Sequence, residues 1–219
     1  MTQARVKICG LTREEDLTVA VRMGADAVGF LVGVPESPRN LTLNRAKKLL
    51  KKVPIFIDKV VVTPPRSIEW LLEINKMFRP SAIQIHGKNE LDSKIILDSI
   101  KDTMLIKTIY VSENSLKEKT IEDLKTFDAI LLDSFSNTQY GGTGKVHDWK
   151  LSRQIKEALE PIPVILAGGL TPDNIKEAIL TVKPFAVDVA SGIESSPGIK
   201  DHKKIRIFIE NAKQIKISN

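Results

Sequence analysis

Short apolar runs alternate with longer amphipathic runs along the whole sequence. The short runs are rich in β-branched residues and predict strands at 6–9, 25–32, 55–62, 82–86, 104–109, 129–133, 164–167 and 186–190. The longer runs predict helices at 13–23, 43–52, 67–78, 90–100, 115–125, 151–159, 173–182 and 201–213. Because strand–helix alternation without a long linker indicates parallel strands, we expect one α/β domain over 1–219. A closed (β/α)8 TIM barrel is the favoured architecture, with an open doubly wound sheet as its competitor.

Two of the predicted helices begin with capping patterns. Thr12 is followed three residues later by Glu15, which is the spacing of a capping box. Thr171 comes directly before Pro172, and a capping hydroxyl before a first-turn proline favours a helix start. Both patterns support the same order of strands and helices.

Polar residues alternate with apolar ones inside two of the predicted strands. Val6 and Ile8 share one face of the first strand, and successive side chains of a strand point to opposite faces. The polar positions on the other face of the first and fourth strands are Lys7, Cys9, Gln84 and His86. These side chains should point into the barrel, where they need partners or a ligand. Cys9 and His86 come last in their strands, at the end where barrel active sites are built.

The composition narrows the classes of partner. The chain has 42% hydrophobic and 27% charged residues, as in an ordinary globular protein. The net charge is +6, but aromatic residues make up only 5% and the lysines are spread over helical segments. We therefore expect an anionic small molecule as the partner, and neither a nucleic acid nor a membrane.

The cysteine and histidine content bears on compartment and cofactors. A single cysteine excludes an internal disulfide, and the N-terminus does not resemble a signal peptide, so we expect a cytoplasmic protein. Three scattered histidines and one cysteine do not form a metal-ligand pattern. We therefore expect no metal ion. A homo-oligomer is compatible with the sequence but is not indicated by it.

Three glycine-containing loops follow the last three predicted strands. Glycine lets backbone N–H groups converge on an anion, and barrels often bind phosphate in the loops after strands seven and eight. Plain turn formation is the alternative for each loop alone. The candidate phosphate-binding residues are Gly142, Gly144, Gly168, Gly169, Ser191 and Gly192.

Cys9 and Asp133 are the candidates for proton transfer. Asp133 ends an apolar run and is either a loop anchor or an acid–base group. Cys9 is either a small buried hydrophobe or a base, and a base needs a pKa lowered by a charge such as that of Lys7. Arg39, in the loop after the second strand, is either solvated or a carboxylate ligand.

The histidines have less specific interpretations. His86 fits a satisfied histidine on the inner face as well as a catalytic one. His147 and His202 have the surroundings of loop or helix-start residues.

The ordered motifs resemble the phosphoribosylanthranilate isomerase family of tryptophan biosynthesis. The matching segments are Val6–Thr12, Gly24–Phe30, Ser37–Arg39, Ile83–Gly87, Leu131–Asp133, Gly141–Lys145, Leu166–Leu170 and Val187–Glu194. Each segment alone is common, but their order over the whole chain is specific. The third strand departs from the family, because Asp58–Pro64 replaces its usual motif.

The resemblance implies an Amadori rearrangement of N-(5-phosphoribosyl)anthranilate without a cofactor or metal. It implies that Cys9 is the general base, Asp133 the general acid and Arg39 the ligand of the anthranilate carboxylate. The residues expected to contact the rest of the substrate are Lys7, Gln84, His86 and Asp188.

Four other interpretations remain. A histidine-pathway phosphoribosyl isomerase should carry an aspartate where this chain has Cys9. A Schiff-base enzyme would use Lys107 in the fifth strand. A non-catalytic phosphosugar-binding barrel would need neither Cys9 nor Asp133. A nucleic-acid binder fits the composition least.

Overall fold

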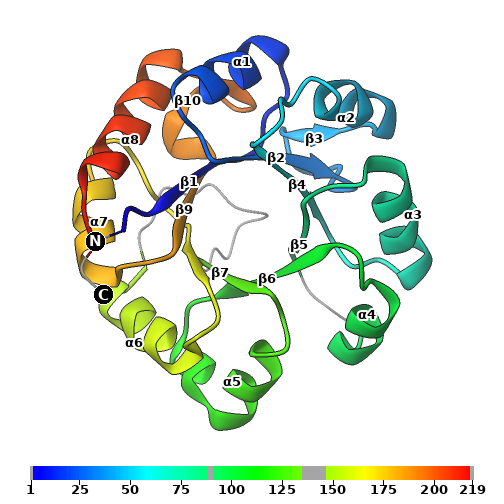
Figure 1. The fold of residues 1–219 in the computed structure, drawn as a ribbon, viewed down its shortest axis with the longest axis vertical. Coiled ribbons are helices and arrows are strands. Elements are labelled where there is room, and N and C mark those ends of the chain that lie inside the picture. Colours follow the sequence, from blue (N-terminus) through cyan, green and yellow to red (C-terminus); the bar gives the residue numbers. More distant parts are fainter. Residues whose placement is uncertain (1, 88–90, 135–146, 218–219) are drawn as a thin grey trace.

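Eight parallel strands form a closed barrel in the computed structural model, which describes residues 2–87, 91–134 and 147–217. The strands are β1 (Arg5–Ile8), β2 (Ala27–Val32), β4 (Asp58–Thr63), β5 (Ala82–Ile85), β6 (Met104–Tyr110), β7 (Ala129–Asp133), β8 (Val164–Leu166) and β9 (Ala186–Val189). Each strand pairs with the next, and β1 pairs with both β2 and β9, which closes the ring (Figure 1). The predicted barrel is therefore confirmed, and the open sheet is not formed.

Helices surround the barrel (Figure 1). They are α1 (Glu14–Arg22), α2 (Leu43–Leu50), α3 (Ile68–Phe78), α4 (Ser93–Ser99), α5 (Glu118–Leu124), α6 (Trp149–Leu159), α7 (Ile175–Val182) and α8 (His202–Gln214). Short additions are β3 (Asn40–Leu41), η1 (Glu113–Leu116), η2 (Ser191–Ile193), β10 (Glu194–Ser196) and β11 (Ile199–Lys200). Most predicted boundaries shift by a few residues, and the helix predicted at 115–125 divides into η1 and α5.

The two predicted capping patterns are wrong. The N-cap of α1 is Arg13 without a side-chain bond, while the Thr12 hydroxyl donates to the carbonyl of Gly198 at 2.6 Å. The N-cap of α7 is Asn174, whose side-chain oxygen accepts from the backbone N–H of Thr171 at 2.8 Å. The Thr12 side chain is thus taken by a tertiary hydrogen bond, and at α7 the side chain of Asn174 bonds the backbone of Thr171 in place of the predicted threonine cap.

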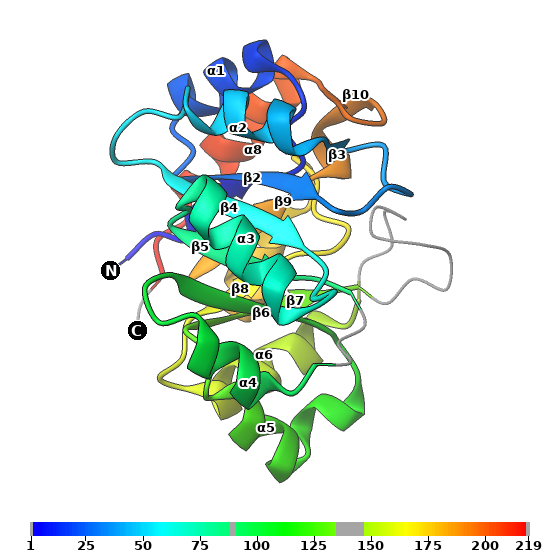
Figure 2. The same ribbon diagram turned by 90° about the vertical axis from the view of Figure 1, so that its right-hand side faces the viewer.

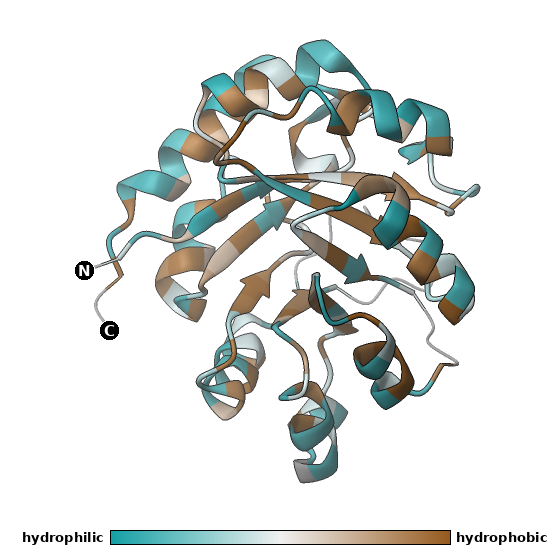
Figure 3. Cartoon of the chain, turned by 45° about the vertical axis from the view of Figure 1, so that its right-hand side comes forward, coloured by the Kyte–Doolittle hydropathy of each residue, from teal (hydrophilic) through white to brown (hydrophobic). Residues whose placement is uncertain are grey.

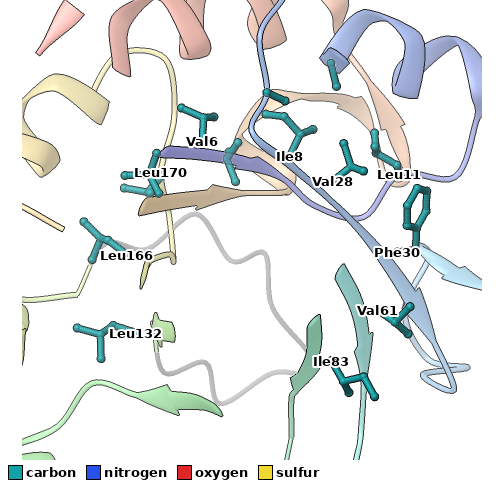
Figure 4. Close-up of a cluster of buried hydrophobic side chains, with 14 of the residues drawn as sticks. Val6, Ile8, Leu11, Val28, Phe30, Val61, Ile83, Leu132, Leu166 and Leu170 are labelled. Atoms are coloured by element: carbon teal, nitrogen blue, oxygen red, sulfur yellow. The ribbon is translucent and has the colours of Figure 1, made fainter. Parts of the chain in front are cut away.

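The barrel wall has an apolar layer on each side. Val6, Ile8 and Val28 extend from their strands toward the surrounding helices (Figure 4), where they join the main core. Inside the barrel, a smaller cluster includes Val60, Val62, Ile106, Leu131 and Ile165. Figure 3 shows the resulting pattern of hydrophobic strands at the centre, surrounded by helices of mixed hydropathy. Burial on both faces fixes the register, because a slip by one residue would exchange the two sets.

The two ends of the barrel differ. The chain termini lie at one end, whereas β3 and β10 lie at the other (Figure 2). This second end holds the carboxyl ends of the parallel strands and the loops that follow them, and we call it the barrel mouth. Among the described residues, no helix combines the length and the apolar character needed to cross a bilayer.

Candidate active site

A cavity at the barrel mouth brings together most of the predicted site residues. Its lining includes Cys9, Arg39, Gln84, His86, Asp133, Asp188, Gly168, Gly169, Ser191 and Gly192. They come from β5, β7 and β9 and from the segments that directly follow β1, β2, β5, β8 and β9, so the closed ring carries distant segments to one place. Lys7 does not line this cavity, and Gly142 and Gly144 lie outside the described residues.

Cys9 lies directly after β1 and is 5% exposed. Its backbone N–H donates to the carbonyl of Val189 at 2.9 Å, which fixes it beside the end of β9. Gly29 packs against its thiol, since a Cβ at that glycine would lie 2.7 Å from Sγ and 3.1 Å from Cε of Lys7. The glycine in β2 therefore makes room for both side chains inside the barrel.

A buried polar network crosses the barrel interior beneath Cys9. Lys7 Nζ donates to Gln84 Oε1 at 2.7 Å and lies 3.2 Å from Asp188 Oδ1. Gln84 Nε2 donates in turn to the Thr108 hydroxyl at 3.2 Å. The inward direction predicted for Lys7 and Gln84 is confirmed. Sequence reasoning missed Thr108, although its even spacing from the interior residue Ile106 in β6 places it on the same face.

The thiol of Cys9 is less acidic than the sequence led us to expect. Burial raises its pKa, and the negative charge of Asp188 raises it further. Lys7 lowers the pKa as expected, and Lys200 does the same, but together they do not overcome burial and Asp188. At neutral pH the neutral thiol is therefore the main form of Cys9.

The pKa of Asp133 is also raised, and in this case the shift suits a carboxyl group that must hold a proton. Burial raises its pKa to about 6, the charge of Asp188 adds to this, and the backbone N–H of Ser134 works against it. That N–H donates to Asp133 Oδ1 at 2.8 Å and so orients the carboxyl group. A pKa near neutrality suits a general acid.

A histidine bridge holds the segment around Asp133. Nδ1 of His147 lies 3.0 Å from the Ser134 hydroxyl, and Nε2 lies 2.6 Å from the hydroxyl of Ser152 in α6. Burial lowers the pKa of His147 to about 4, so the ring is neutral at physiological pH. The predicted place of His147 before a helix is confirmed, but its contact with the site was not foreseen.

His86 follows β5 at the mouth. Burial lowers its pKa to about 4, and the charge of Lys7 contributes to the decrease. Its ring meets that of Tyr110 edge to face with centroids 6.2 Å apart. Nδ1 is buried without a hydrogen-bond partner among the described residues. A neutral imidazole with a free nitrogen at the mouth can bind a hydroxyl of a ligand.

Arg39 is buried and paired, not solvated. Its guanidinium forms a two-bond ion pair with Glu194, at 2.8 Å from Nε and 2.7 Å from Nη2. Lys200 Nζ binds the same carboxylate at 2.9 Å. Sequence reasoning placed neither Glu194 nor Lys200 in the site, because no local pattern links them to a residue so far away in the chain. Gly10 makes room for Arg39, since a Cβ there would lie 2.6 Å from its Cδ.

Two of the three predicted glycine loops meet at the mouth cavity. Gly168 and Gly169 have φ values of 80° and 67°, which favour glycine. Gly192 lies in η2 against the first of these loops, and a Cβ there would be 1.9 Å from the carbonyl oxygen of Leu170. The close approach brings the backbone of both loops to the lining of the cavity, and a backbone rich in glycine can approach an anion closely.

The Schiff-base alternative loses support from the geometry. Lys107 lies on the outer face of β6, with Nζ 5.7 Å from the ring centroid of Phe127, and it does not line the mouth cavity. A Schiff base at this residue would therefore form away from the mouth. Within the described ranges, no three His, Cys, Asp or Glu side chains are grouped as metal ligands would be.

Almost the whole chain matches a single protein family. Residues 6–211 match the family model described as N-(5'-phosphoribosyl)anthranilate (PRA) isomerase. The isomerase of Haloferax volcanii is 43% identical over 95% of this chain and 93% of the relative. That of Methanosarcina acetivorans is 42% identical over 96% of this chain and 94% of the relative.

Solved structures agree with the sequence comparison. The phosphoribosylanthranilate isomerase of Thermotoga maritima superposes with a TM-score of 0.85 at 37% identity, covering 97% of this chain and all of that one. A phosphoribosylanthranilate isomerase in complex with reduced 1-(o-carboxyphenylamino)-1-deoxyribulose 5-phosphate gives a TM-score of 0.82 at 35% identity with the same coverage. This chain therefore belongs to the N-(5'-phosphoribosyl)anthranilate isomerase family.

Proposed function

We propose that this chain, acting as one barrel domain, converts N-(5'-phosphoribosyl)anthranilate to 1-(2-carboxyphenylamino)-1-deoxyribulose 5-phosphate in tryptophan biosynthesis. The observation that carries the proposal is the placement of Cys9 and Asp133 on one mouth cavity, together with Arg39 and two glycine loops. The related enzyme that binds the reduced product analogue supports the same substrate class. The reaction opens the ribose ring and relocates protons within one molecule, with no net gain or loss of electrons, so the proposal requires neither a metal nor a redox cofactor.

Asp133 is the general acid of the first step. Its proton passes to the ring oxygen of the ribose, the bond between that oxygen and C1′ breaks, and the amine nitrogen lone pair forms an iminium. A raised pKa makes this transfer easier than it would be for an exposed aspartic acid, which holds its proton only under acid conditions. The bond from Ser134 holds the carboxyl group in place.

Cys9 is the general base of the second step. Its thiolate removes the proton from C2′, and the electron pair of that bond neutralises the iminium, giving an enolamine. The enolamine then takes a proton at C1′ and loses the one on its C2′ hydroxyl, so the ketone product has the same atoms as the substrate. Because burial raises the pKa of Cys9, the positive charges of Lys7 and Lys200 are needed to sustain any thiolate.

The remaining residues bind and orient the substrate. Arg39 binds the anthranilate carboxylate. The backbone of Gly168, Gly169, Ser191 and Gly192 binds the phosphate, joined in the proposal by Gly142 and Gly144. Gln84, His86 and Asp188 contact the sugar, and Lys7 supports Gln84 and Asp188 from below the mouth.

A fluorescence assay tests this function directly. Purified protein should consume N-(5'-phosphoribosyl)anthranilate, whose fluorescence disappears as the substrate is converted. A folded protein that binds the reduced product analogue without turning over the substrate would instead support the non-catalytic phosphosugar-binding barrel. Turnover of only the bulkier histidine-pathway substrate would support the other isomerase and contradict the proposal.

A further inference from the structure

Arg39 uses only one edge of its guanidinium in its ion pair. Nε and Nη2 each donate to one oxygen of Glu194, so the carboxylate spans the Nε–Nη2 edge. Nη1 has no hydrogen-bond partner in the part of the chain that the structure describes. The neighbouring Nη1–Nη2 edge can bind a second carboxylate by donating two parallel N–H bonds to it.

Glu194 also binds a second buried cation. Lys200 Nζ donates to Glu194 Oε1 and to the carbonyl oxygen of Ala190, both at 2.9 Å, and its side chain is fully buried. The side chains of Arg39 and Glu194 are 9% and 6% exposed. Two cations around one anion leave a net positive charge in a buried place, which is unfavourable until another anion neutralises it. A carboxylate arriving at Arg39 would complete the charge balance.

The side chains of Arg39, Glu194 and Lys200 connect segments that are assigned to opposite ends of the proposed substrate. Arg39 lies in the loop after β2, Glu194 begins β10, and Lys200 ends β11. The bond from Lys200 to Ala190 lies one residue before the proposed phosphate residue Ser191. Glu194 therefore contacts the arginine assigned to one end of the substrate and belongs to the same segment as a loop assigned to the other end.

We propose that Glu194 is a positioning residue that makes the site specific for substrates with a ring carboxylate. This inference rests on the proposed function, because it takes Arg39 as the group that binds the carboxylate. Glu194 holds the Nε–Nη2 edge, so Arg39 presents its other edge in a fixed direction, and Lys200 holds Glu194. A fork fixed before binding loses less rotational freedom when the carboxylate arrives.

The test measures how much the carboxylate contributes to binding. Two inhibitors are compared by their inhibition constants: reduced 1-(o-carboxyphenylamino)-1-deoxyribulose 5-phosphate and the same molecule without its ring carboxylate. The proteins are the wild type, Arg39→Ala, Glu194→Gln and the double variant. Glu157→Gln is the matched control, since it weakens an Arg–Glu pair on the surface of α6.

The ratio of the two constants should respond in a specific way. Arg39→Ala should abolish the preference for the carboxylate, and Glu194→Gln should reduce it roughly tenfold, as expected for one charge-assisted hydrogen bond. Affinity for the inhibitor without a carboxylate should change much less. The double variant should resemble Arg39→Ala, and Glu157→Gln should resemble the wild type.

Each alternative result separates the two proposals. If Arg39→Ala keeps the preference, the carboxylate role of Arg39 is wrong and the inference fails with it. If Arg39→Ala loses the preference for the carboxylate but Glu194→Gln keeps it, Glu194 does not position Arg39 and the inference is wrong. Should Glu194→Gln not fold, a structure of the wild-type protein with the reduced inhibitor decides: the inference requires Glu194 on the Nε–Nη2 edge and the ligand carboxylate on the other edge, and a broken Arg39–Glu194 pair overturns it.

Discussion

Gly168 lies so close to Asp133 that no residue with a side chain fits at position 168 without moving its neighbours. A Cβ at this glycine would be 2.8 Å from Asp133 Oδ1 and 2.3 Å from the hydroxyl oxygen of Ser134. The loop after β8 therefore helps to set the position of the proposed general acid at the end of β7. Two effects of an alanine at position 168 can therefore be told apart, namely backbone strain and displacement of Asp133. Gly24 also has a positive φ but has no site residue beside it, so an alanine there causes strain alone.

Gly168→Ala should lower kcat at least tenfold, because the new methyl group must displace Asp133 or Ser134. The control is Gly24→Ala, at a φ of 96°, where the nearest atom to a Cβ would be Lys213 Nζ at 3.9 Å. Backbone strain should cost each variant roughly 1–2 kcal/mol of unfolding free energy. Gly168→Ala should be the less stable of the two, because its Cβ would also lie 2.5 Å from the backbone nitrogen of Ser134. Steady-state kinetics with urea unfolding distinguishes them, and equal kcat values in the two variants would contradict the assigned contact.

Cys9→Ala and Asp133→Asn should each lower kcat by about 10²–10⁴, the usual contribution of a positioned acid or base. Substrate binding should change less, because the fold and the other contacts remain. Circular dichroism confirms the fold, and progress curves of substrate fluorescence give kcat and KM. Turnover near the wild-type value in either variant would remove that residue from the mechanism.

The pH profile of kcat/KM should reflect the small fraction of free enzyme in which both catalytic groups are in their active protonation states. Activity needs protonated Asp133, with a pKa of about 6, and thiolate Cys9, whose pKa is raised above its ordinary value of 9.0. Because the pKa of the acid lies below that of the base, protonated Asp133 and thiolate Cys9 coexist in only a small fraction of the molecules. We expect kcat/KM to rise up to about pH 6, stay level, and fall only above the pKa of the thiol.

Asp133→Asn offers an internal check on that profile. Without the acid, the residual kcat/KM should depend on the thiolate alone and rise about tenfold per pH unit through neutrality. A level profile in this variant would show that Cys9 is not the titrating base.

Asp133 should also make the wild type less stable as pH rises. Its pKa is about 6 when folded and about 3.9 in an unfolded chain, so below about pH 4 both states are protonated. Between these values the unfolded state ionises first, and stability falls by at most roughly 3 kcal/mol as pH passes the folded pKa. Asp133→Asn should remove this loss, which urea unfolding at about pH 4 and about pH 7.5 would detect.

His147→Phe should reduce kcat roughly tenfold with little change in KM, since it removes the hydrogen bonds that hold Ser134 and Ser152. His202→Phe is the matched control: His202 bonds Asp16 at 2.9 Å and does not line the mouth cavity. Stopped assays at saturating substrate would compare the two. A normal kcat in His147→Phe would limit the histidine to a structural role.

Local patterns were enough to favour a closed barrel over an open sheet and to predict the faces of its first and fourth strands. The alternation of Lys7 and Cys9 with Val6 and Ile8 has the period of a strand, and this period alone decides which side chains point inward. Cys9 and Asp133 were also predictable as mouth residues, because each comes last in its predicted strand and parallel strands of a closed barrel end on the same side.

Contacts between distant segments decided the rest. Glu194 meets Arg39 across 155 residues of chain, and no local signal in either segment specifies the pair. The raised pKa of the Cys9 thiol results from burial and from Asp188 on a neighbouring strand, although adjacent Lys7 alone predicted the opposite. The sequence by itself determined which groups are available and which way their strands face. Only the tertiary structure decided which charges become partners and how far each is removed from water, because desolvation and ion pairing depend on distances that chain order does not contain.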